Sequence, residues 1–299
     1  MNNSAAREEL QHILVAEQLP AMPQSALSIL KLDNDLAKIN INDLVRPIEA
    51  DPGLAAQVLK FLNSSAFGFQ SAISNIRQGI ALVGIRIVKN FVLWKAIFSL
   101  IPKSKNGSFD IAILWQDSLR RAMFARYILL EIKRGDPEMA FAGALLQDMA
   151  VPLLLKLKAA EYSQVLNTLT TVGTKRLSVL EQEKFGWDHS DAGFVLGQQW
   201  KLPELLTSLI GSHLRVQELC ADFAQCPEGA IVAISALLPT VTKNEWDEQD
   251  SFWEYFTSLF PNNARLASLL FDRVDREFDS YAELFMIQTP KRSLFSYMD

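Results

Sequence analysis

The chain has 299 residues, of which 49% are hydrophobic and 21% charged, and its net charge is −5. A chain of this length holds one large domain or two small ones and needs no disulfides for stability. Its two cysteines, Cys220 and Cys226, lack the spacing of a disulfide framework or of a zinc ribbon. This use of cysteine is typical of a reducing compartment and predicts a cytoplasmic protein. The N-terminus lacks the pattern of a signal peptide and no run of about 18 uncharged apolar residues is present, so we expect a soluble protein without membrane contact.

The expected elements are helices throughout, because glycine is scarce and apolar residues recur at i, i+3 and i+4. We therefore predict an all-α protein with little or no sheet. Pro23 and Pro52 mark first helical turns, and the expected early helices cover 23–32, 41–50 and 52–63. After a loop of small residues, Gly84 separates a short helix from a long one that is apolar nearly all round and is therefore predicted to be buried.

Pro102–Ser108 is the best linker candidate, because it combines Pro, Gly, Ser and Lys in seven residues. Beyond it we expect helices at 110–133, from Pro137 onward, at 161–171 and at 178–185, then a helical hairpin and amphipathic helices to the C-terminus. These boundaries predict three regions: an N-terminal helical region (residues 1–107), a second helical region (residues 108–215), and an acidic helical extension (residues 216–299).

Charge is distributed unevenly along these regions. Between Gly53 and Phe109 there are seven basic side chains and no acidic one. From Arg215 onward fourteen acidic side chains stand against seven basic ones. Segments of opposite charge either attract each other within the fold or bind separate partners.

The run "GALLQDMAVPLLL" (Gly143–Leu155) places Gln147 and Asp148 among apolar residues, on the helix expected after Pro137. An unpaired carboxylate in a protein core costs several kcal/mol. Asp148 is therefore predicted to lie at the surface, to be satisfied by structural partners, or to belong to a site.

Two of the three histidines, His189 and His213, bracket the expected hairpin. Each lies twelve residues from Lys201 in the turn, so antiparallel packing brings both imidazoles to the same height. Joined by a carboxylate from a third helix, they form a ligand set suited to Zn, Mn or Fe. The alternative is structural, with His189 in a helical first turn capped by Asp188 and His213 at a helix C-terminus.

The spacings allow five polar side chains to converge, although they do not require it: Asp117, Gln147, Asp148, His189 and His213. Motifs of other chemistries are lacking. The sequence has no GxSxG nucleophile elbow, no P-loop and no GxGxxG fingerprint. Acyl transfer and P-loop chemistry therefore have no support.

Three segments of the first half carry a series of motifs in one order. They are "LPAMPQSALSIL" (Leu19–Leu30), "IEADPGLAAQVLKFLNSSAFGF" (Ile48–Phe69) and "ISNIRQGIALVGIRIVKNFVL" (Ile73–Leu93). In this order they resemble LPxLPxxAxxLL, IxxDPxLxxxLLxLxNSAxFG and IxSIxxAIxxLGxxxLxxLVL of the HDOD domain, an output domain related to the HD metal-dependent phosphohydrolases. A weaker match through Trp115, "GALLQDMA", "WDHSDAGFVLGQQWKLP" and "LIGSH" extends the resemblance to Leu214.

The resemblance implies a multi-helix, HD-like bundle with a degenerate pocket. Gln147-Asp148 stands where HD hydrolases have His-Asp, the first ligand position falls near Asp117, and His213 matches one histidine of a later pair. Because an amide binds first-row metals more weakly than imidazole does, the resemblance implies no enzymatic activity and no cofactor. The alternative is a residual metal-dependent phosphohydrolase in which Asp148, His189 and His213 hold a divalent ion.

The resemblance also implies a non-catalytic, bacterial signal-transduction module that contacts a signalling protein. The candidate partner surface consists of Asn63, Ser64, Arg77, Arg86 and Lys89. Asn63 and Ser64 alternatively satisfy backbone groups at a helix end. A third interpretation is nucleic-acid binding by the basic stretch 53–109, with Arg86, Lys89 and Asn90 facing a groove. The apolar helix after Gly84 favours a core position instead.

Overall fold

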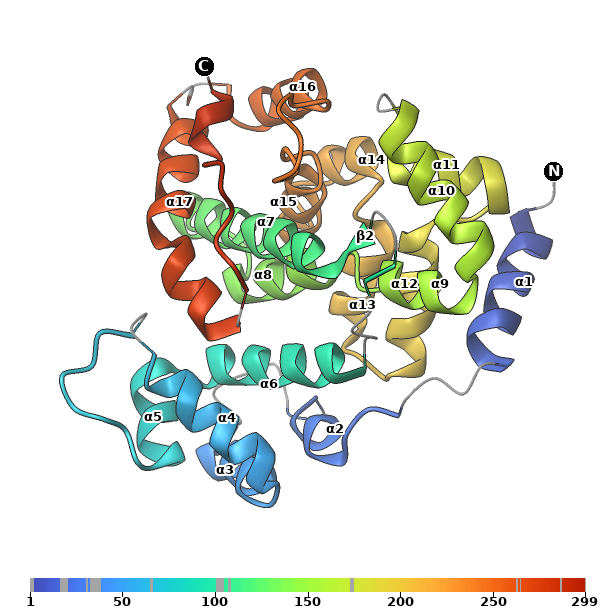
Figure 1. Cartoon of the computed structure of the whole chain (residues 1–299). Helices are drawn as coiled ribbons and strands as arrows, with labels where there is room; N and C mark the ends of the chain where they lie inside the picture. Colours follow the sequence, from blue (N-terminus) through green and yellow to red (C-terminus); the bar gives the residue numbers. More distant parts are fainter. Residues whose placement is uncertain are drawn as a thin grey trace. The chain divides into compact units, whose positions relative to one another are not determined.

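The computed structural model of the chain describes residues 3–16, 21–30, 32, 39–64, 67–100, 105–106, 109–172, 175–261, 263, 265–285 and 287–298. The prediction of an all-α fold with little sheet is confirmed (Figure 1). Within these residues the only strands are β1 (Lys105–Asn106) and β2 (Phe109–Asp110), which pair antiparallel. The predicted linker 102–108 lies outside the described residues except for β1.

The chain divides into two compact units. The larger unit comprises Met1–Leu19, Ile101–Asp279 and Ile287–Asp299, and the smaller unit comprises Pro20–Leu100 and Ser280–Met286. One helix, α17 (Leu266–Phe285), contributes residues to both. The division of the chain at residues 107 and 215 into three regions stays a prediction.

The smaller unit holds α2 (Gln24–Leu30), α3 (Ile41–Glu49), α4 (Pro52–Leu62), α5 (Ile76–Val83) and α6 (Ile85–Leu100). Its helix starts follow the local sequence, because Asn40, Asp51 and Asn75 accept hydrogen bonds from the backbone of the first turns of α3, α4 and α5. Gly84 ends α5 at a φ of 103°, a conformation that favours glycine.

Helix α6 is the core helix of the smaller unit, as its apolar composition predicts. Eight of its residues are buried, among them Phe91 and Trp94. Phe91 stacks on Phe61 of α4 with ring centroids 4.0 Å apart, and Phe285 meets Trp94 edge-on at 4.4 Å. The last turn of α17 thus completes an aromatic core built by α4 and α6.

The larger unit is built around α7 (Ile111–Ile132) and α8 (Pro137–Leu146), which pack side by side, with α15 (Pro227–Ser235) against both (Figure 1). Asp110 caps α7, and Asp136 followed by Pro137 starts α8. The remaining elements of this unit are α1 (Asn3–Ala16), α9 (Val151–Leu157), α10 (Ala159–Val172), α11 (Leu177–Phe185), α12 (His189–Gln199), α13 (Glu204–Ser212), α14 (Val216–Ala221), α16 (Gln249–Leu259) and η3 (Phe295–Tyr297).

The helix expected to carry Gln147 and Asp148 is shorter than predicted. It ends at Leu146, residues 147–150 form a turn, and α9 begins at Val151. The physical reason is Pro152, which has no N–H to donate to the carbonyl of Asp148 and occupies the first turn of a new helix. Asp148 therefore lies in a turn between two helices.

The stretch Pro137–Leu157 is long and apolar enough to cross a membrane, but 89% of its most apolar window is buried inside the protein. Every residue from Ala140 to Leu155 is buried. Burial of this kind is typical of core elements, so the hydropathy of α8 and α9 is explained by packing. The cytoplasmic location stays a prediction.

The C-terminal segment Ile287–Met298, which we call the strap, is fastened within the larger unit by side chains that bind its backbone. Gln116 and Arg120 of α7 donate hydrogen bonds to the carbonyls of Gln288 and Arg292 at 2.8 and 2.6 Å. Asp275 of α17 accepts hydrogen bonds from the two N–H groups at Leu294 and Phe295, both at 2.7 Å. The strap is thereby held as an ordered layer against α7 and α17.

Candidate metal centre

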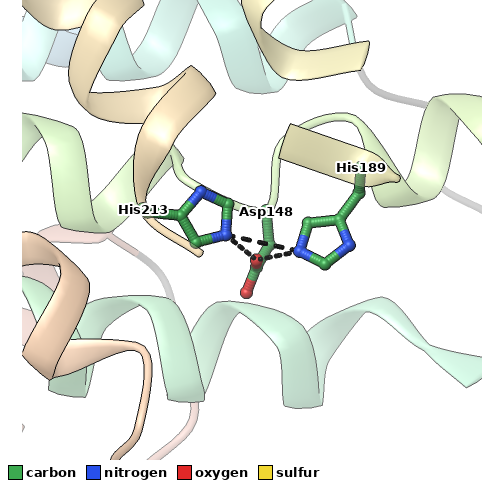
Figure 2. Close-up of side chains that lie close together, drawn as sticks. All are labelled: Asp148, His189 and His213. Atoms are coloured by element: carbon green, nitrogen blue, oxygen red, sulfur yellow. Dashed lines mark hydrogen bonds and ion pairs between the residues drawn. The ribbon is translucent and has the colours of Figure 1, made fainter. Parts of the chain in front are cut away.

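Asp148, His189 and His213 meet in the larger unit and are called the triad below (Figure 2). Nε2 of His189 lies 3.3 Å and Nε2 of His213 lies 3.6 Å from Oδ1 of Asp148. The two Nε2 atoms are 3.3 Å apart. All three residues are buried, so these contacts replace contacts with water.

The hairpin of α12 and α13 brings the two histidines together, as their equal distances from Lys201 predict. His189 begins α12 behind the N-cap Asp188, and His213 is the C-cap of α13. The helices approach closely at glycines, because a Cβ on Gly193 would lie 2.7 Å from the Ile210 side chain. His189 therefore lies in a capped first turn and His213 at a helix C-terminus, as the structural alternative predicts, and the two rings also converge.

The outer nitrogen of each imidazole is held by an acceptor. Nδ1 of His189 lies 2.6 Å from Oε2 of Glu181, which also accepts a hydrogen bond from the His189 backbone N–H at 3.0 Å. The Tyr162 hydroxyl donates to the other oxygen of this fully buried carboxylate. Nδ1 of His213 donates to the carbonyl of Ile210 at 2.7 Å. Metal-binding histidines use their second nitrogen in this way, which aims the Nε2 lone pair at the ion.

The spacing of the three facing atoms fits a metal ion. A tetrahedral ion with bonds of about 2.1 Å holds its ligand atoms about 3.4 Å apart, whereas an octahedral ion holds neighbouring ligands about 3.0 Å apart. The observed separations of 3.3, 3.3 and 3.6 Å match the tetrahedral case. Two imidazoles and one carboxylate are a ligand set suited to zinc and to other first-row metals. Zinc in such a site acts as a Lewis acid when a fourth position is open.

The second oxygen of Asp148 has its own partner, because Nη1 of Arg121 on α7 donates to Oδ2. Burial alone would raise the pKa of Asp148. The guanidinium of Arg121 and the hydrogen bonds from both imidazoles outweigh burial and hold the pKa of this carboxyl well below its usual range. Asp148 is therefore an ionised, fully engaged carboxylate.

The two histidines differ in charge. Burial favours the neutral form of both, but the carboxylates of Glu181 and Asp148 outweigh it at His189 and raise its pKa well above the ordinary value. Burial lowers the pKa of His213, and the neighbouring charge of His189 lowers it further. Without a metal, the centre thus consists of a His189 imidazolium, a neutral His213 and an Asp148 carboxylate.

Asp117 and Gln147, the other two residues that the sequence allows to converge, do not join the triad. Oδ1 of Asp117 accepts a hydrogen bond from the backbone N–H of Val241 at 2.8 Å. Burial raises the pKa of Asp117 to about 6, against the opposing charge of Arg121. Gln147 is fully buried, and neither polar atom of its side chain has a hydrogen-bond partner among the described residues.

Glu181, Tyr162 and Arg121 are site residues that the sequence did not reveal. Glu181 lies on α11, eight residues before His189, and Tyr162 lies on α10. The segment "LEQEKFGWDHS" does contain a signal, because Glu181 precedes His189 and Gly186 lies between them as a turn residue. Arg121 offers only its i, i+4 spacing from Asp117, which is common on helices.

A cavity of about 590 Å³ lies beside residues that flank the histidines in sequence, and it is lined in part by Asp188, Ser190, Leu214 and Arg215. The triad does not contribute to its lining. The cavity therefore opens next to the segments that carry the triad without exposing the facing nitrogens.

The proposed partner-surface residues lie in the smaller unit and have different surroundings. Asn63 clamps its loop, because its amide donates to the carbonyl of Ile73 at 2.7 Å and accepts from the N–H of Ile73 at 2.6 Å. The Ser64 hydroxyl is buried and has no hydrogen-bond partner in the described stretches of the chain. Arg77 is exposed and Arg86 half-buried. Lys89 donates to the carbonyl of Leu32 at 2.9 Å, a contact within the unit.

Comparison with known proteins gives one family and several relatives. The family model of the HDOD domain matches residues 19–216. A crystal structure of an HDOD domain protein of unknown function from Geobacter sulfurreducens matches with a TM-score of 0.73 and 20% identity, over 94% of this chain and 98% of that one. A protein of Marinobacter aquaeolei VT8, provisionally named a signal transduction protein, matches with a TM-score of 0.71 and 17% identity, over 95% of this chain and 65% of its own.

The curated relatives are longer proteins. An uncharacterized protein of Treponema pallidum is 23% identical over 207 residues, which are 67% of this chain and 39% of that protein. The chain therefore spans about two fifths of the length of this relative. At these identities the solved structures establish the fold.

Proposed function

Because the chain belongs to the HDOD domain family, we propose that it is a non-catalytic regulatory module of signal transduction that acts through protein contacts and holds one divalent metal ion at Asp148, His189 and His213. The resemblance found in the sequence favoured no cofactor. The reason to propose an ion is the convergence of two Nε2 atoms and one carboxylate oxygen at 3.3 to 3.6 Å.

The burial of the triad supports a regulatory role over a catalytic one. The exposed fractions of Asp148, His189 and His213 are 8%, 4% and 1%. Hydrolysis at a metal centre requires a phosphate ester and an activated water to reach the ion together. A centre that is closed by its own side chains, with Gln147 in place of the first histidine of the HD pair, supports binding without turnover.

The second candidate function is metal-dependent phosphohydrolysis at the same three residues. It is favoured by the arrangement of Glu181 and the Ile210 carbonyl behind the histidines, because such outer partners are typical of working metal sites. The two candidates share the ion and differ in turnover, so one set of experiments separates them.

The test is metal analysis with an activity assay on the same preparations. Purified protein is stripped with a chelator, titrated with Zn²⁺ and Mn²⁺ by calorimetry, and assayed with bis-p-nitrophenyl phosphate. We expect one ion per chain and no turnover. His213→Gln should weaken zinc binding by about a hundredfold or more, since it removes a direct ligand.

The matched control is His12→Gln, because His12 is an exposed histidine on α1 that does not belong to the triad. It should bind zinc as the parent chain does. Absence of metal binding by the parent chain would contradict the proposed ion. Metal-dependent turnover that disappears in Asp148→Asn would establish the hydrolase instead.

A further inference from the structure

We propose that Arg121 restricts the candidate metal centre to one ion bound through one oxygen of Asp148. This inference rests on the proposed metal-binding function and deepens it. It concerns a residue outside the triad, on a helix that supplies none of the three ligands.

The two oxygens of Asp148 have separate roles. Oδ1 faces Nε2 of both histidines, whereas Oδ2 is bonded to Nη1 of Arg121. The exposed fractions of the Arg121 and Asp148 side chains are 13% and 11%, so both partners are largely removed from water. Breaking this contact would leave a mostly buried carboxylate oxygen without its donor, which is costly.

Arg121 also lies near a second carboxylate. Asp117 is one helical turn away on α7, and the charge of Arg121 opposes the effect of burial on the pKa of Asp117. Without Arg121, the buried carboxylates of Asp117 and Asp148 would both lose its positive charge. A pair of that kind favours a further cation, and the guanidinium supplies the positive charge instead.

Occupation of Oδ2 limits what Asp148 can do for an ion. A carboxylate whose second oxygen is engaged binds through one atom, so it can neither chelate an ion with both oxygens nor bridge two ions with one oxygen on each. Two-metal hydrolases hold their metals about 3.5 to 4 Å apart, a separation that the two oxygens of one carboxylate can span. Arg121 is thus a positioning residue that sets the number of ions and the coordination of Asp148.

The test replaces Arg121 by Met, which keeps an unbranched apolar stem and removes the charge and the donors. Co²⁺ serves as the probe, because its visible absorption is strong with four ligands and weakens with five or six. We expect one Co²⁺ per parent chain with a four-ligand spectrum. In Arg121→Met we expect affinity to rise by about tenfold or more, since a nearby positive charge is lost, and the band to weaken as Oδ2 joins the ion.

Three further variants make the result specific. Arg121→Lys keeps the charge and should behave as the parent chain does. Arg126→Met removes an arginine of the same helix that pairs with Glu138 of α8 at 2.6 Å, outside the triad, and should leave cobalt binding unchanged. Arg121→Gln removes the charge but keeps a donor, and it carries the affinity test if circular dichroism shows that Arg121→Met is unfolded.

The outcomes separate this inference from the proposed function. If the parent chain binds one Co²⁺ and the neutral variants of Arg121 bind it with the same affinity and spectrum, the role of Arg121 is overturned while the proposed ion stands. If neither the parent chain nor the variants bind Co²⁺, both are overturned. Binding of two ions by the parent chain would overturn both the role of Arg121 and the proposed stoichiometry of one ion, whereas loss of binding in His213→Gln would still place an ion at the triad.

Discussion

Arg120 and Arg121 are neighbours on α7 and belong to two different buried polar clusters. Arg121 donates to the carboxylate of Asp148, whose other oxygen faces two imidazoles. Arg120 is 1% exposed and donates to the backbone carbonyl of Arg292 in the strap. Two of the Arg120 nitrogens, Nε and Nη1, have no hydrogen-bond partner within the portion of the chain that the structure describes.

The two clusters differ in the groups to which their side chains are hydrogen-bonded. Next to the triad, the Tyr162 hydroxyl bonds to the Glu181 carboxylate, and the same carboxylate bonds to Nδ1 of His189. The other nitrogen of this ring, Nε2, faces Nε2 of His213. Around Arg120, side chains bind backbone, which fastens one segment to another. The first arrangement aims two imidazoles and one carboxylate at one point, whereas the second fastens one segment of the chain to another.

The largest expected effect is the loss of Glu181. Glu181→Ala leaves the Tyr162 hydroxyl and the His189 ring without their acceptor in a fully buried place, so we expect the free energy of unfolding to fall by about 3 to 5 kcal/mol. Urea denaturation followed by circular dichroism measures the change. Glu183→Ala, which removes an exposed carboxylate paired with Lys175, should cost less than about 1 kcal/mol. An equal fall in the free energy of unfolding in the two variants would show that the buried contacts of Glu181 stabilise the fold no more than an exposed ion pair does.

A smaller effect is expected at the strap. Asp275→Ala removes the acceptor of two backbone N–H groups and should lower the free energy of unfolding by about 2 kcal/mol while leaving zinc affinity unchanged. Denaturation and zinc titration of the same protein check the two expectations. Asp272→Ala, which breaks only an exposed pair with Arg276, is the matched control and should cost about 0.5 kcal/mol or less. A loss of zinc binding in Asp275→Ala would join the two clusters and refute their separation.

The smallest effect is the pH dependence of Asp117. Its pKa is raised by burial to about 6 from an ordinary value of 3.8, so protonation stabilises the folded chain below pH 3.8 and this contribution is lost as pH rises through 6. Asp117→Asn stays neutral and keeps an oxygen for the N–H of Val241. Its stability advantage over the parent chain should be larger at pH 8 than at pH 5 by about 1.4 kcal/mol. Urea denaturation at the two pH values measures this, and an advantage that is equal at both would place the Asp117 pKa near its ordinary value.

Much of the fold follows from local sequence signals. Asp110, Asp136-Pro137 and Asp51-Pro52 start α7, α8 and α4, because side-chain caps and proline act within one turn. The hairpin symmetry placed His189 and His213 at one height, and the structure has their Nε2 atoms 3.3 Å apart. These features depend on spacing along one chain segment, which a sequence displays directly.

Other features required the folded chain. Pro152 signals the break before α9, but the resulting turn of Asp148 toward Arg121 depends on how α8 packs on α7. The Tyr162, Glu181 and His189 series joins three helices whose facing positions have no common period. The hydrogen bond that Asp117 accepts from the N–H of Val241 joins residues 124 positions apart in the chain.

A crystal structure of the zinc-loaded chain, with anomalous data collected on both sides of the zinc absorption edge, tests the proposed ion most directly. We expect one anomalous peak, within about 2.0 to 2.2 Å of Oδ1 of Asp148 and of Nε2 of both His189 and His213, with Arg121 still bonded to Oδ2. A density map without a peak between these three atoms, from crystals grown with excess zinc, would contradict it.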